Sequence, residues 1–387
     1  MASGTLHFAI EPDFISCGIS LVKKCLDILF DMLQFKLPDK ARILIIKPSA
    51  LGDICHALPV LSFLRSKYPK AHLAWLVNNS LAPLLSGHAL LDELILFDRA
   101  ALGKGLIHGF MAWNGLTNRL RRTKWDLVLD LQGLARSGLM AFLARSQRRW
   151  GLADAREGSR LAYSRQIRIP NLETHAVIRY WQAARFLGGN LDPIIPQLIL
   201  PPIETDKANT MMSMQPRPWL VAAPGARWIT KRWPPTSFAK VIDRALNSFG
   251  GTAWIVGARD ESMLGASLRS SMSNQAIDLT GSTSLLEMAA ILGQADLVLA
   301  NDSGPLHVAV ALGRQVVCPF LCTRPRLTGP FGQTRHVVWA KSPCRGSLVR
   351  ICPTKMECMN DLEWSQIYAV VESILSQARE NEWGTKG

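Results

Sequence analysis

The sequence predicts an α/β protein with two doubly wound domains in tandem, each built on a parallel sheet. The first observation is length, because 387 residues exceed what a single hydrophobic core usually serves. The second is rhythm, since short apolar runs alternate with helical stretches from Arg42 onward, as in repeated βα units. The third is the proline-rich stretch DPIIPQLILPPIETD at 192–206, which separates two such series like a linker.

Residues 1–40 form an N-terminal extension ahead of the first βα unit. Its apolar residues recur at helical spacing, and Pro38 ends the pattern. They are Ile15, Ile19, Val22, Leu26, Leu29 and Leu33. The extension therefore predicts an amphipathic helix. This helix either packs on the body of the protein or lies at a membrane interface with Lys23, Lys24 and Lys36 at the lipid headgroups.

Four apolar runs in the first half predict strands that are buried on both faces. They are RILII at 42–46, HLAWLV at 72–77, ELILF at 93–97 and DLVLDL at 126–131. Short runs of Val, Ile and Leu between helical stretches are typical of the parallel sheets of βα folds. The stretch HAVIRYWQAARFLG at 175–188 predicts the last helix of this half.

The second half repeats the rhythm with five predicted strands. They are WLVAA at 219–223, TAWIVG at 252–257, AIDLTG at 276–281, DLVLAND at 296–302 and QVVCPF at 315–320. A last helix at 362–379 has an apolar stripe and needs a surface to cover. We expect a first domain at 41–195, a linker at 196–217, a second domain at 218–361, and a C-terminal helix and tail at 362–387. Ligands bind beyond the carboxyl ends of such strands, so both domains can face one central cleft.

The charge balance predicts an anionic partner. The net charge of +14 and the pI near 9.7 suit nucleic acid, an anionic membrane surface or a phosphorylated substrate. The sequence has neither an RNA-binding signature of the KGFGFVxF kind nor a finger spacing of cysteines and histidines, so we expect no nucleic acid. The eight cysteines are scattered and no cleavable signal opens the chain, so we expect a cytoplasmic protein with reduced thiols and no spanning helix.

The stretch KPSALGDICHALP at 47–59 has more polar residues than a strand-to-helix turn needs. Ser49 or Asp53 alone could cap the helix that follows. The residues from Ser49 to Gly52 bend the chain off the first strand, which leaves Asp53 at the helix start, facing the cleft. Asp53 is therefore either a cap or a carboxylate that serves as a general base.

The strongest candidate site of the second half is LANDSGPLHVAVALG at 299–313. Asp302 follows a strand, Ser303 and Gly304 open a helix, and His307 lies one turn in. A helix N-terminus offers unpaired N–H groups and the positive end of a dipole, and glycine lets an anion approach the backbone closely. We therefore expect an anion site here. An ordinary capped helix with a buried histidine would show the same pattern.

Two further strand ends of the second half carry charges. APGARWITKRWPPTSFAKVI at 223–242 places Lys231 and Arg232 ahead of a helix, where they hold a diphosphate or form a solvated basic loop. IVGARDESML at 255–264 places Asp260 and Glu261 where they bind ribose hydroxyls or complement a helix dipole. Because GxGxxG and GxxxxGKS/T motifs are absent, the pattern favours group transfer from a nucleotide that is held by its diphosphate.

Six stretches of the chain, taken together, carry a family resemblance. They are ILIIKPSALGDICHALPVLSFLR, WDLVLDLQGLARS, APGARWITKRWP, GSTSLLEMAAILGQADLVLANDSGPLHVAVALG, TRPRLTGPFG and the tail CxxxxxCMNDL. In this order and spacing they resemble the lipopolysaccharide heptosyltransferase family of GT-B glycosyltransferases, type I more closely than type II. The resemblance runs from about residue 41 to the C-terminus and implies the GT-B fold, with two Rossmann-like domains facing a cleft.

The resemblance also implies an activity. The enzyme would be an inverting glycosyltransferase of lipopolysaccharide biosynthesis, of the EC 2.4 class. It would move heptose from ADP-heptose to the Kdo and lipid A inner core, as a peripheral protein at the cytoplasmic face of the inner membrane. No cofactor is implied, and the chain lacks a DxD motif that would hold a metal.

Matched residue by residue, the resemblance assigns roles to the candidates. Asp53 matches the proposed general base, Lys231 the lysine that contacts the donor phosphate, and Glu261 the ribose-binding acid. The donor element DSGxxH is matched by Asp302, Ser303, Gly304 and His307. By their position alone, the first-domain strand ends add three weaker candidates for contact with an acidic acceptor: Lys47, Gln132 and Arg136.

Two alternatives to this function stay open on the sequence. One is a transferase of the same architecture that uses another nucleotide-sugar donor or a protein acceptor. The other is a sugar-nucleotide binding protein without catalysis, against which Asp53 and Lys231 argue. Cys344, Cys352 and Cys358 could be ligands of a structural metal, but they are spaced more loosely than the ligands of usual zinc sites. We therefore expect no metal.

Overall fold

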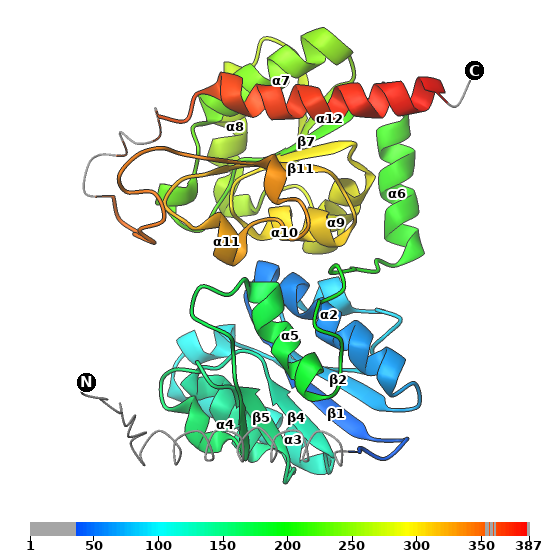
Figure 1. The fold of residues 1–387 in the computed structure, drawn as a ribbon, viewed down its shortest axis with the longest axis vertical. Helices are drawn as coiled ribbons and strands as arrows, with labels where there is room; N and C mark the ends of the chain where they lie inside the picture. The colour runs from blue at the N-terminus through cyan, green and yellow to red at the C-terminus, as the bar shows by residue number, and fades with distance from the viewer. Residues whose placement is uncertain (1–35, 353–355, 357–358, 360, 385–387) are drawn as a thin grey trace, which may run out of the picture.

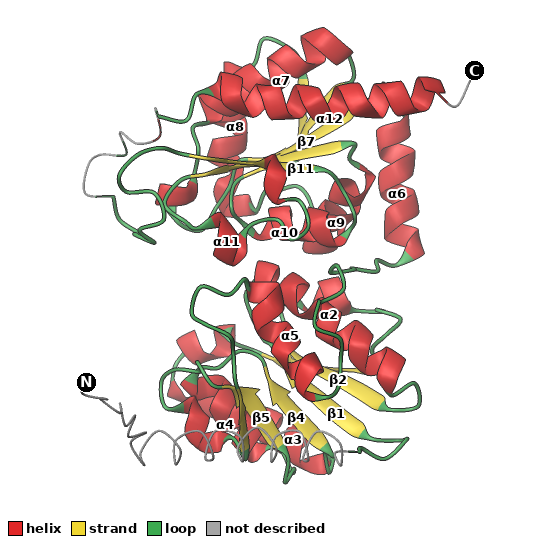
Figure 2. Cartoon of the chain, viewed as in Figure 1, coloured by secondary structure: helices red, strands yellow, loops and turns green. Residues whose placement is uncertain are grey.

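The computed structural model describes residues 36–352, 356, 359 and 361–384. The helix predicted in the N-terminal extension, and Cys358, lie outside these residues. Two parallel sheets form two domains, which are stacked one above the other in Figure 1. Figure 2 shows each sheet as a layer between helices. The predicted doubly wound α/β architecture is thus confirmed.

The first domain is a six-stranded sheet with the order β3-β2-β1-β4-β5-β6. Its strands are β1 (Arg42–Ile46), β2 (His72–Asn78), β3 (Glu93–Phe97), β4 (Leu127–Asp130), β5 (Arg149–Leu152) and β6 (Arg165–Ile167). Its helices are α2 (Leu51–Lys67), α3 (Leu106–Arg122), α4 (Ala135–Leu143) and α5 (Ala176–Phe186). Ile43 and Ile45 pack with α2 and α5, whereas Leu44 and Ile46 pack with α3 and α4. Because β1 is buried on both faces, RILII is apolar almost throughout.

The second domain repeats this topology with the order β12-β11-β10-β7-β8-β9. Its strands are β7 (Trp219–Ala223), β8 (Thr252–Ile255), β9 (Ala276–Asp278), β10 (Leu297–Ala300), β11 (Val316–Phe320) and β12 (Val337–Trp339). Its helices are α7 (Pro235–Phe249), α8 (Ser262–Ser271), α9 (Leu285–Gln294), α10 (Gly304–Ala311), α11 (Pro325–Thr328) and α12 (Trp364–Gly384). Counted from the start of each domain, both sheets have the strand order of dinucleotide-binding folds.

All nine predicted strands are present, and the sequence missed three others: β5, β6 and β12. These are only three or four residues long and lie toward the outer edge of their sheets. The letters RWGL and RQI give little apolar signal, since strands near a sheet edge need less burial. The predicted last helix is α12, whose buried Ile367 and Val371 belong to the core between α12 and α7 (Figure 1).

The connection between the domains contains a helix of its own. Within the predicted linker at 196–217, α6 (Pro202–Ser213) packs against α9 of the second domain. Ahead of it, Leu198 is buried and donates its N–H to the Ala311 carbonyl at 2.8 Å. The domain boundaries at 41–195, 218–361 and 362–387 stay a prediction.

The described helices were also compared with the dimensions of a bilayer. In the part of the chain that the structure describes, no helix combines the length and the hydrophobicity that crossing a membrane requires.

Candidate active site between the two domains

Two helix N-termini, one from each domain, meet where the domains face each other. Helix α2 begins shortly after β1, and α10 begins shortly after β10. Glycines allow their close approach, because a Cβ on Gly52 would lie 2.4 Å from His307 Cδ2, and a Cβ on Gly304 would lie 2.5 Å from Leu51 Cδ2. The first turns of α2 and α10 therefore lie side by side (Figure 1).

Asp53 lies in the first turn of α2 with 37% of its side chain exposed. Its Oδ1 accepts a hydrogen bond from the Tyr180 hydroxyl at 2.8 Å, and its Oδ2 accepts one from the Ala50 N–H at 3.2 Å. The Lys47 ammonium lies 3.7 Å from Oδ2. Asp53 thus caps the helix start and still has an accessible edge.

The charges around Asp53 keep its carboxylate ionised. Burial raises the pKa of Asp53, but the Lys47 ammonium and the hydrogen bonds from Tyr180 and the Ala50 N–H outweigh burial and lower it to about 2. Lys47 is itself buried, which lowers its pKa, although Asp53 opposes that shift. Its ammonium lies 4.8 Å from the centroid of the Tyr180 ring. Lys47 therefore neutralises Asp53 from inside the first domain.

Asp302 is the charged centre on the side of the second domain. Its side chain is only 4% exposed, and its Oδ2 accepts hydrogen bonds from Lys231 Nζ at 2.7 Å and from Thr328 Oγ1 at 3.4 Å. Burial raises the pKa of Asp302, but a hydrogen bond from His307 and the charge of Lys231 outweigh burial and lower it. The pairing with Lys231 therefore keeps the Asp302 carboxylate ionised just ahead of α10.

Three buried histidines connect the two domains: His56 of α2, His175 ahead of α5, and His307 of α10. His56 Nε2 and His307 Nδ1 are 3.1 Å apart, and His307 Nε2 lies 3.6 Å from Asp302 Oδ1. His175 Nε2 lies 3.0 Å from the Gly329 carbonyl, so this nitrogen carries the proton that is donated. A polar chain therefore runs from Asp302 through His307 to His56, across the domain boundary.

Glu261 and Asn301 arrange the loops that follow the second-domain strands. A Cβ on Gly225 would lie 2.1 Å from Glu261 Oε1, so the glycine leaves the room that this carboxylate occupies. The buried Asn301 accepts a hydrogen bond from the Trp233 N–H at 3.1 Å and donates one to the Pro224 carbonyl at 2.7 Å. Asn301 thereby fixes the loop after β7 against the end of β10.

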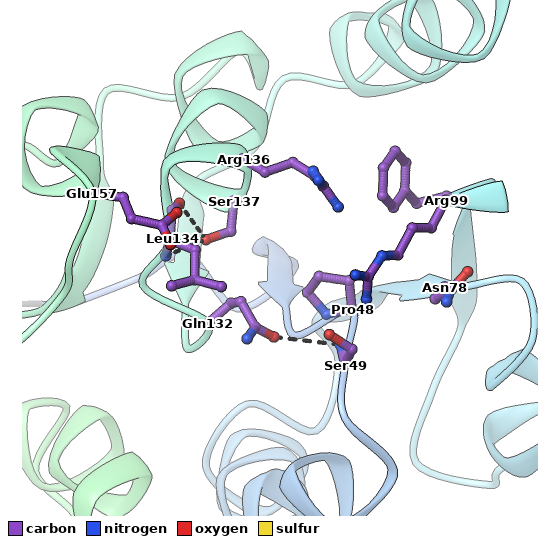
Figure 3. A pocket seen from close by; sticks show the side chains of 10 residues that line it. Pro48, Ser49, Asn78, Arg99, Gln132, Leu134, Arg136, Ser137 and Glu157 are labelled. Atoms are coloured by element: carbon purple, nitrogen blue, oxygen red, sulfur yellow. Dashed lines mark hydrogen bonds between the residues drawn. The ribbon is translucent and has the colours of Figure 1, made fainter. Parts of the chain in front are cut away.

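A pocket of about 180 Å³ opens at the strand ends of the first domain (Figure 3). Gln132 lines it, and its Oε1 accepts a hydrogen bond from the Ser49 N–H at 3.3 Å. Arg99, which follows β3, and Arg136, in the first turn of α4, extend into the pocket from two sides (Figure 3). Glu157 also lines the pocket, and its Oε2 accepts a hydrogen bond from the Ala135 N–H at 3.1 Å. Two guanidinium groups against one carboxylate favour an anionic ligand.

One family model covers most of the chain. The model of glycosyltransferase family 9 (heptosyltransferase) matches residues 113–357. The chain belongs to glycosyltransferase family 9. It is therefore a glycosyltransferase, as the resemblance implied.

Relatives and solved structures agree with membership of glycosyltransferase family 9. Lipopolysaccharide heptosyltransferase 1 of Pseudomonas aeruginosa is 27% identical over 320 residues, which are 80% of this chain and 87% of that protein. The glycosyl transferase family 9 structure from Veillonella parvula has a TM-score of 0.73 and 20% identity, covering 87% of this chain and 97% of that one. E. coli heptosyltransferase WaaC with ADP-2-deoxy-2-fluoro heptose has a TM-score of 0.68 and 22% identity, and the match covers 86% of this chain and 99% of that one. These structures confirm the predicted GT-B fold.

The structure brings together site residues that were predicted in separate domains of this family 9 enzyme. Asp53 and His307 lie on the two helices that touch, and Asp302 and Lys231 adjoin His307. The Ser303 hydroxyl at the start of α10 is buried and hydrogen-bonds to none of the described residues. Gln132 and Arg136 line the first-domain pocket, whereas Lys47 does not, being buried behind Asp53.

Sequence reasoning missed several residues of this family 9 site. Tyr180 and His175 lie in the predicted helix at 175–188, and Thr328 lies in the stretch TRPRLTGPFG, but no local pattern marked any of them. His56 could have been suspected only from its position, one helical turn after Asp53 in the predicted helix. Its contact with His307 joins residues 251 positions apart, and spacing along the chain does not show such a contact.

The cysteine-rich tail of the family 9 chain is described in part. Cys344 and Cys352 are half-buried, and Cys358 lies outside the described residues. Among the residues that the structure does describe, no group of three or more His, Cys, Asp or Glu side chains could hold a metal ion. Whether the tail binds a metal is not tested by this, so the expectation of none stays a prediction.

The contact between Gly52 and His307 leads to a prediction for the family 9 enzyme. Replacing Gly52 with Ala places a methyl group 2.4 Å from His307 Cδ2, which must move that ring or part the two helices. Because displacing a positioned group by about 1 Å can cost on the order of 10²-fold in rate, we expect kcat of Gly52→Ala to fall at least about tenfold. Gly115→Ala on α3 is the matched control, since a Cβ there meets nothing within 4 Å. Equal turnover of both variants would contradict the close packing of α2 on α10.

The buried histidines lead to a second prediction, for stability against pH. Burial lowers the pKa of His56 well below its usual value and that of His175 to about 4. Unfolded histidines titrate near pH 6.5, so unfolding takes up protons that the buried rings exclude. The stability that these neutral rings contribute is present above about pH 6.5 and falls as the pH drops towards about 4. We expect the midpoint of thermal unfolding to fall over this range, and less steeply in His56→Gln/His175→Gln. Variant His108→Gln, at an exposed position of α3, should keep the wild-type slope.

Proposed function

We propose that this glycosyltransferase moves heptose from ADP-heptose to the Kdo and lipid A inner core of lipopolysaccharide, with inversion and without a metal. The observation that carries the proposal is the contact of α2 with α10. It brings the Asp53 carboxylate of one domain close to the cationic helix start of the other, which has Lys231 beside it. The similarity to lipopolysaccharide heptosyltransferase 1 of Pseudomonas aeruginosa and to E. coli heptosyltransferase WaaC supports heptose as the transferred sugar.

The second domain is proposed to hold the donor. The N-terminus of α10 offers free N–H groups at Gly304, the orphan hydroxyl of Ser303 and the ammonium of Lys231, all of which suit a diphosphate. His307 lies one turn in and adds a polar ring. Glu261, over Gly225 and after β8, is the acid proposed to bind the ribose hydroxyls.

The first domain is proposed to hold the acceptor. The pocket lined by Gln132, Arg136 and Arg99 has the charge that the carboxylate of an acidic sugar, or a lipid phosphate, requires. An acceptor anchored in lipid A would bring the protein to the cytoplasmic face of the inner membrane, as a peripheral protein. The chain's net charge of +14 suits an anionic membrane surface.

The proposed reaction is a single displacement. The acceptor hydroxyl oxygen bonds to the anomeric carbon while its proton passes to Asp53, and the bond from that carbon to the diphosphate oxygen breaks, leaving its electron pair on ADP. Since the pKa of Asp53 is about 2, the carboxylate is ionised beforehand and takes the proton only as the new bond makes the hydroxyl acidic. Lys231 and the amides at the start of α10 stabilise the charge that develops on the diphosphate.

The test is a transfer assay with the purified full chain. The protein is incubated with ADP-heptose and a Kdo-bearing lipid A in detergent, and the product mass is measured. We expect the mass of one heptose to be added to the acceptor. Transfer from a different nucleotide sugar but not from ADP-heptose would show that the donor is wrong. Tight binding of ADP without any turnover would favour a sugar-nucleotide binding protein instead.

A further inference from the structure

The positive charge of the chain is concentrated in one stretch of the first domain. Residues 99–168 hold 14 Lys and Arg against 4 Asp and Glu, so they carry +10 of the chain's net charge of +14. This stretch runs from the end of β3 through α3 and α4 to just beyond β6. The basic character of the protein is therefore largely a property of one region.

The four acids of this stretch are engaged with neighbouring groups. Asp130 is buried and accepts a hydrogen bond from the Tyr163 hydroxyl at 2.6 Å, and Asp154 pairs with Arg179. Asp126 accepts a hydrogen bond from the Arg42 N–H at 2.8 Å, and Glu157 accepts one from the Ala135 N–H at 3.1 Å. One acid outside the stretch, Glu93, pairs with Arg119. These acids are too few to balance the fourteen cations, so the region keeps a strong positive potential.

The same region exposes large apolar side chains. At the start of α3, Leu106 is 93% exposed, Ile107 74%, Phe110 73% and Met111 66%. Leu106 and Phe110, like Ile107 and Met111, are four residues apart, so all four lie on one side of the helix. The opposite side of α3 is buried through Leu116 and Leu120. A cluster of this kind on a protein surface marks an interaction site.

Helix α4 extends this surface. It packs beside α3 on the same face of the first sheet, away from α2 and α5 (Figure 1). Phe142 of α4 is 62% exposed, and Arg145 and Arg148 follow it on the exposed surface. We name the exposed residues of the two helices and of the turns beside them the α3/α4 surface: Leu106, Ile107, Phe110, Met111 and Phe142, with Lys104, Arg121, Arg122, Lys124, Arg145 and Arg148.

We propose that the α3/α4 surface docks on an anionic lipid bilayer, and that it thereby presents the first-domain pocket to an acceptor anchored in that bilayer. Apolar side chains projecting from a helix among many lysines and arginines are the pattern of interfacial membrane binding. A second protein chain is the weaker match, since a surface with this excess of lysine and arginine would need an unusually acidic partner. The second clause rests on the proposed function, because only a lipid-linked acceptor would need this presentation.

The position of the pocket supports the same inference. Helix α3 follows β3, and α4 follows β4, so the first turns of both helices lie at the carboxyl edge of the sheet. The pocket with Arg99 and Arg136 opens at this edge (Figure 3). Arg136 lies in the first turn of α4, and its guanidinium lies 5.8 Å from the centroid of the Phe97 ring. If α3 lies on a bilayer, a lipid headgroup that projects from the bilayer near the start of α3 would thus lie close to the pocket.

The test is sedimentation of the full chain with vesicles of phosphatidylcholine and phosphatidylglycerol. We expect binding that weakens with salt and is lost on pure phosphatidylcholine. Variant Ile107→Ser/Phe110→Ser should reduce the bound fraction at least about fivefold, since it removes the two apolar anchors. The matched control is Ile203→Ser/Met214→Ser, in which the first residue is 62% and the second 74% exposed, on and just after α6. This control should bind as the wild type does.

Three outcomes would overturn the proposal. The first is equal vesicle binding by Ile107→Ser/Phe110→Ser and the wild type. The second is loss of all binding when residues 1–35 are deleted, with the α3/α4 surface intact. The third is a wild-type dimer that the double variant makes monomeric, because the surface would then join two copies.

Heptose transfer is assayed in detergent, so that a failure of membrane docking can be distinguished from a failure of the proposed reaction. Vesicle binding without any heptose transfer would support membrane docking by the α3/α4 surface and contradict the proposed reaction. Heptose transfer in detergent without vesicle binding would support the proposed reaction and contradict membrane docking by the α3/α4 surface. Unchanged midpoints of thermal unfolding in both double variants show that the exposed substitutions leave the fold intact.

Discussion

Asp53→Asn is expected to lower kcat of heptose transfer by about 10²- to 10⁴-fold while ADP still binds with its wild-type affinity. Asparagine keeps the shape of the side chain, and its oxygen can still accept the hydrogen bond from the Ala50 N–H while its NH2 group donates to the Tyr180 hydroxyl oxygen, but it cannot take the proton of the acceptor hydroxyl. Since Asp53 belongs to the first domain, the proposed donor site around Asp302 is left intact. The two quantities to measure are kcat, by product mass against time, and the dissociation constant of ADP, by calorimetry.

The control for Asp53→Asn must deal with Lys47. This lysine is buried and 3.7 Å from the carboxylate, so the variant leaves a buried cation without its counter-charge. The thermal midpoint therefore has to be measured, so that a folding defect is not mistaken for a catalytic one. Asp206→Asn, an exposed position of α6, provides the matched neutralisation. Full turnover by a folded Asp53→Asn would mean that another group is the base.

Lys231→Ala is expected to weaken ADP binding and to lower kcat, together by about 10²- to 10³-fold. The ammonium lies 2.7 Å from Asp302, just ahead of α10, and its side chain is 18% exposed, which leaves it within reach of a ligand. Without it, Asp302 keeps only the His307 and Thr328 contacts and becomes an unbalanced negative charge that repels a diphosphate. Calorimetry with ADP and the transfer assay measure the two effects separately.

Lysine 207 of α6 offers the comparison for this variant. Lys207 is 63% exposed and pairs with Glu204 of its own helix at 3.2 Å, so Lys207→Ala removes a charge of the same sign from a helix outside the candidate site. Its ADP affinity and kcat should equal those of the wild type. If Lys231→Ala behaved in the same way, the diphosphate would have to bind elsewhere in the second domain.

The sequence predicts the central strands well because their burial leaves few choices of residue. RILII and WLVAA are apolar because both faces of β1 and β7 are covered. An apolar run of this length is recognisable in the sequence without any structure. The strand β6, RQI, is half-exposed at an edge and has no such restriction. The sequence likewise predicts α10, because the letters DSG followed by proline mark the start of a helix.

The arrangement of the candidate site is less accessible from the sequence, because contacts across the domain boundary have no fixed spacing. Asp53 was expected to be either a cap or a base, and the structure shows the cap while leaving an exposed edge for the second role. Lys47 appears in the letters as a cation at a strand end, and nothing local shows that it is buried against Tyr180. The partner His56 of His307 could be found only by folding both domains.

The anchored connection between the domains determines where one could rotate against the other. The Trp181 indole N–H donates to the Asn190 carbonyl at 2.9 Å, which holds the chain to the first domain up to that residue. The bond from the Leu198 N–H to the Ala311 carbonyl holds the chain to the end of α10 from that residue onward. We expect such a rotation to take place in the residues between these anchors, LDPIIPQ at 191–197, which would then form the hinge.

Rotation about this hinge would carry α10 as a rigid part of the second domain. His307 and Asp302 would leave α2 together, and the contact of His307 with His56 would open. The general base and the donor site would then be assembled once in each catalytic cycle and separated for product release. An enzyme built in this way would have its base out of reach of the donor whenever the domains are apart, which would limit wasteful hydrolysis of the nucleotide sugar.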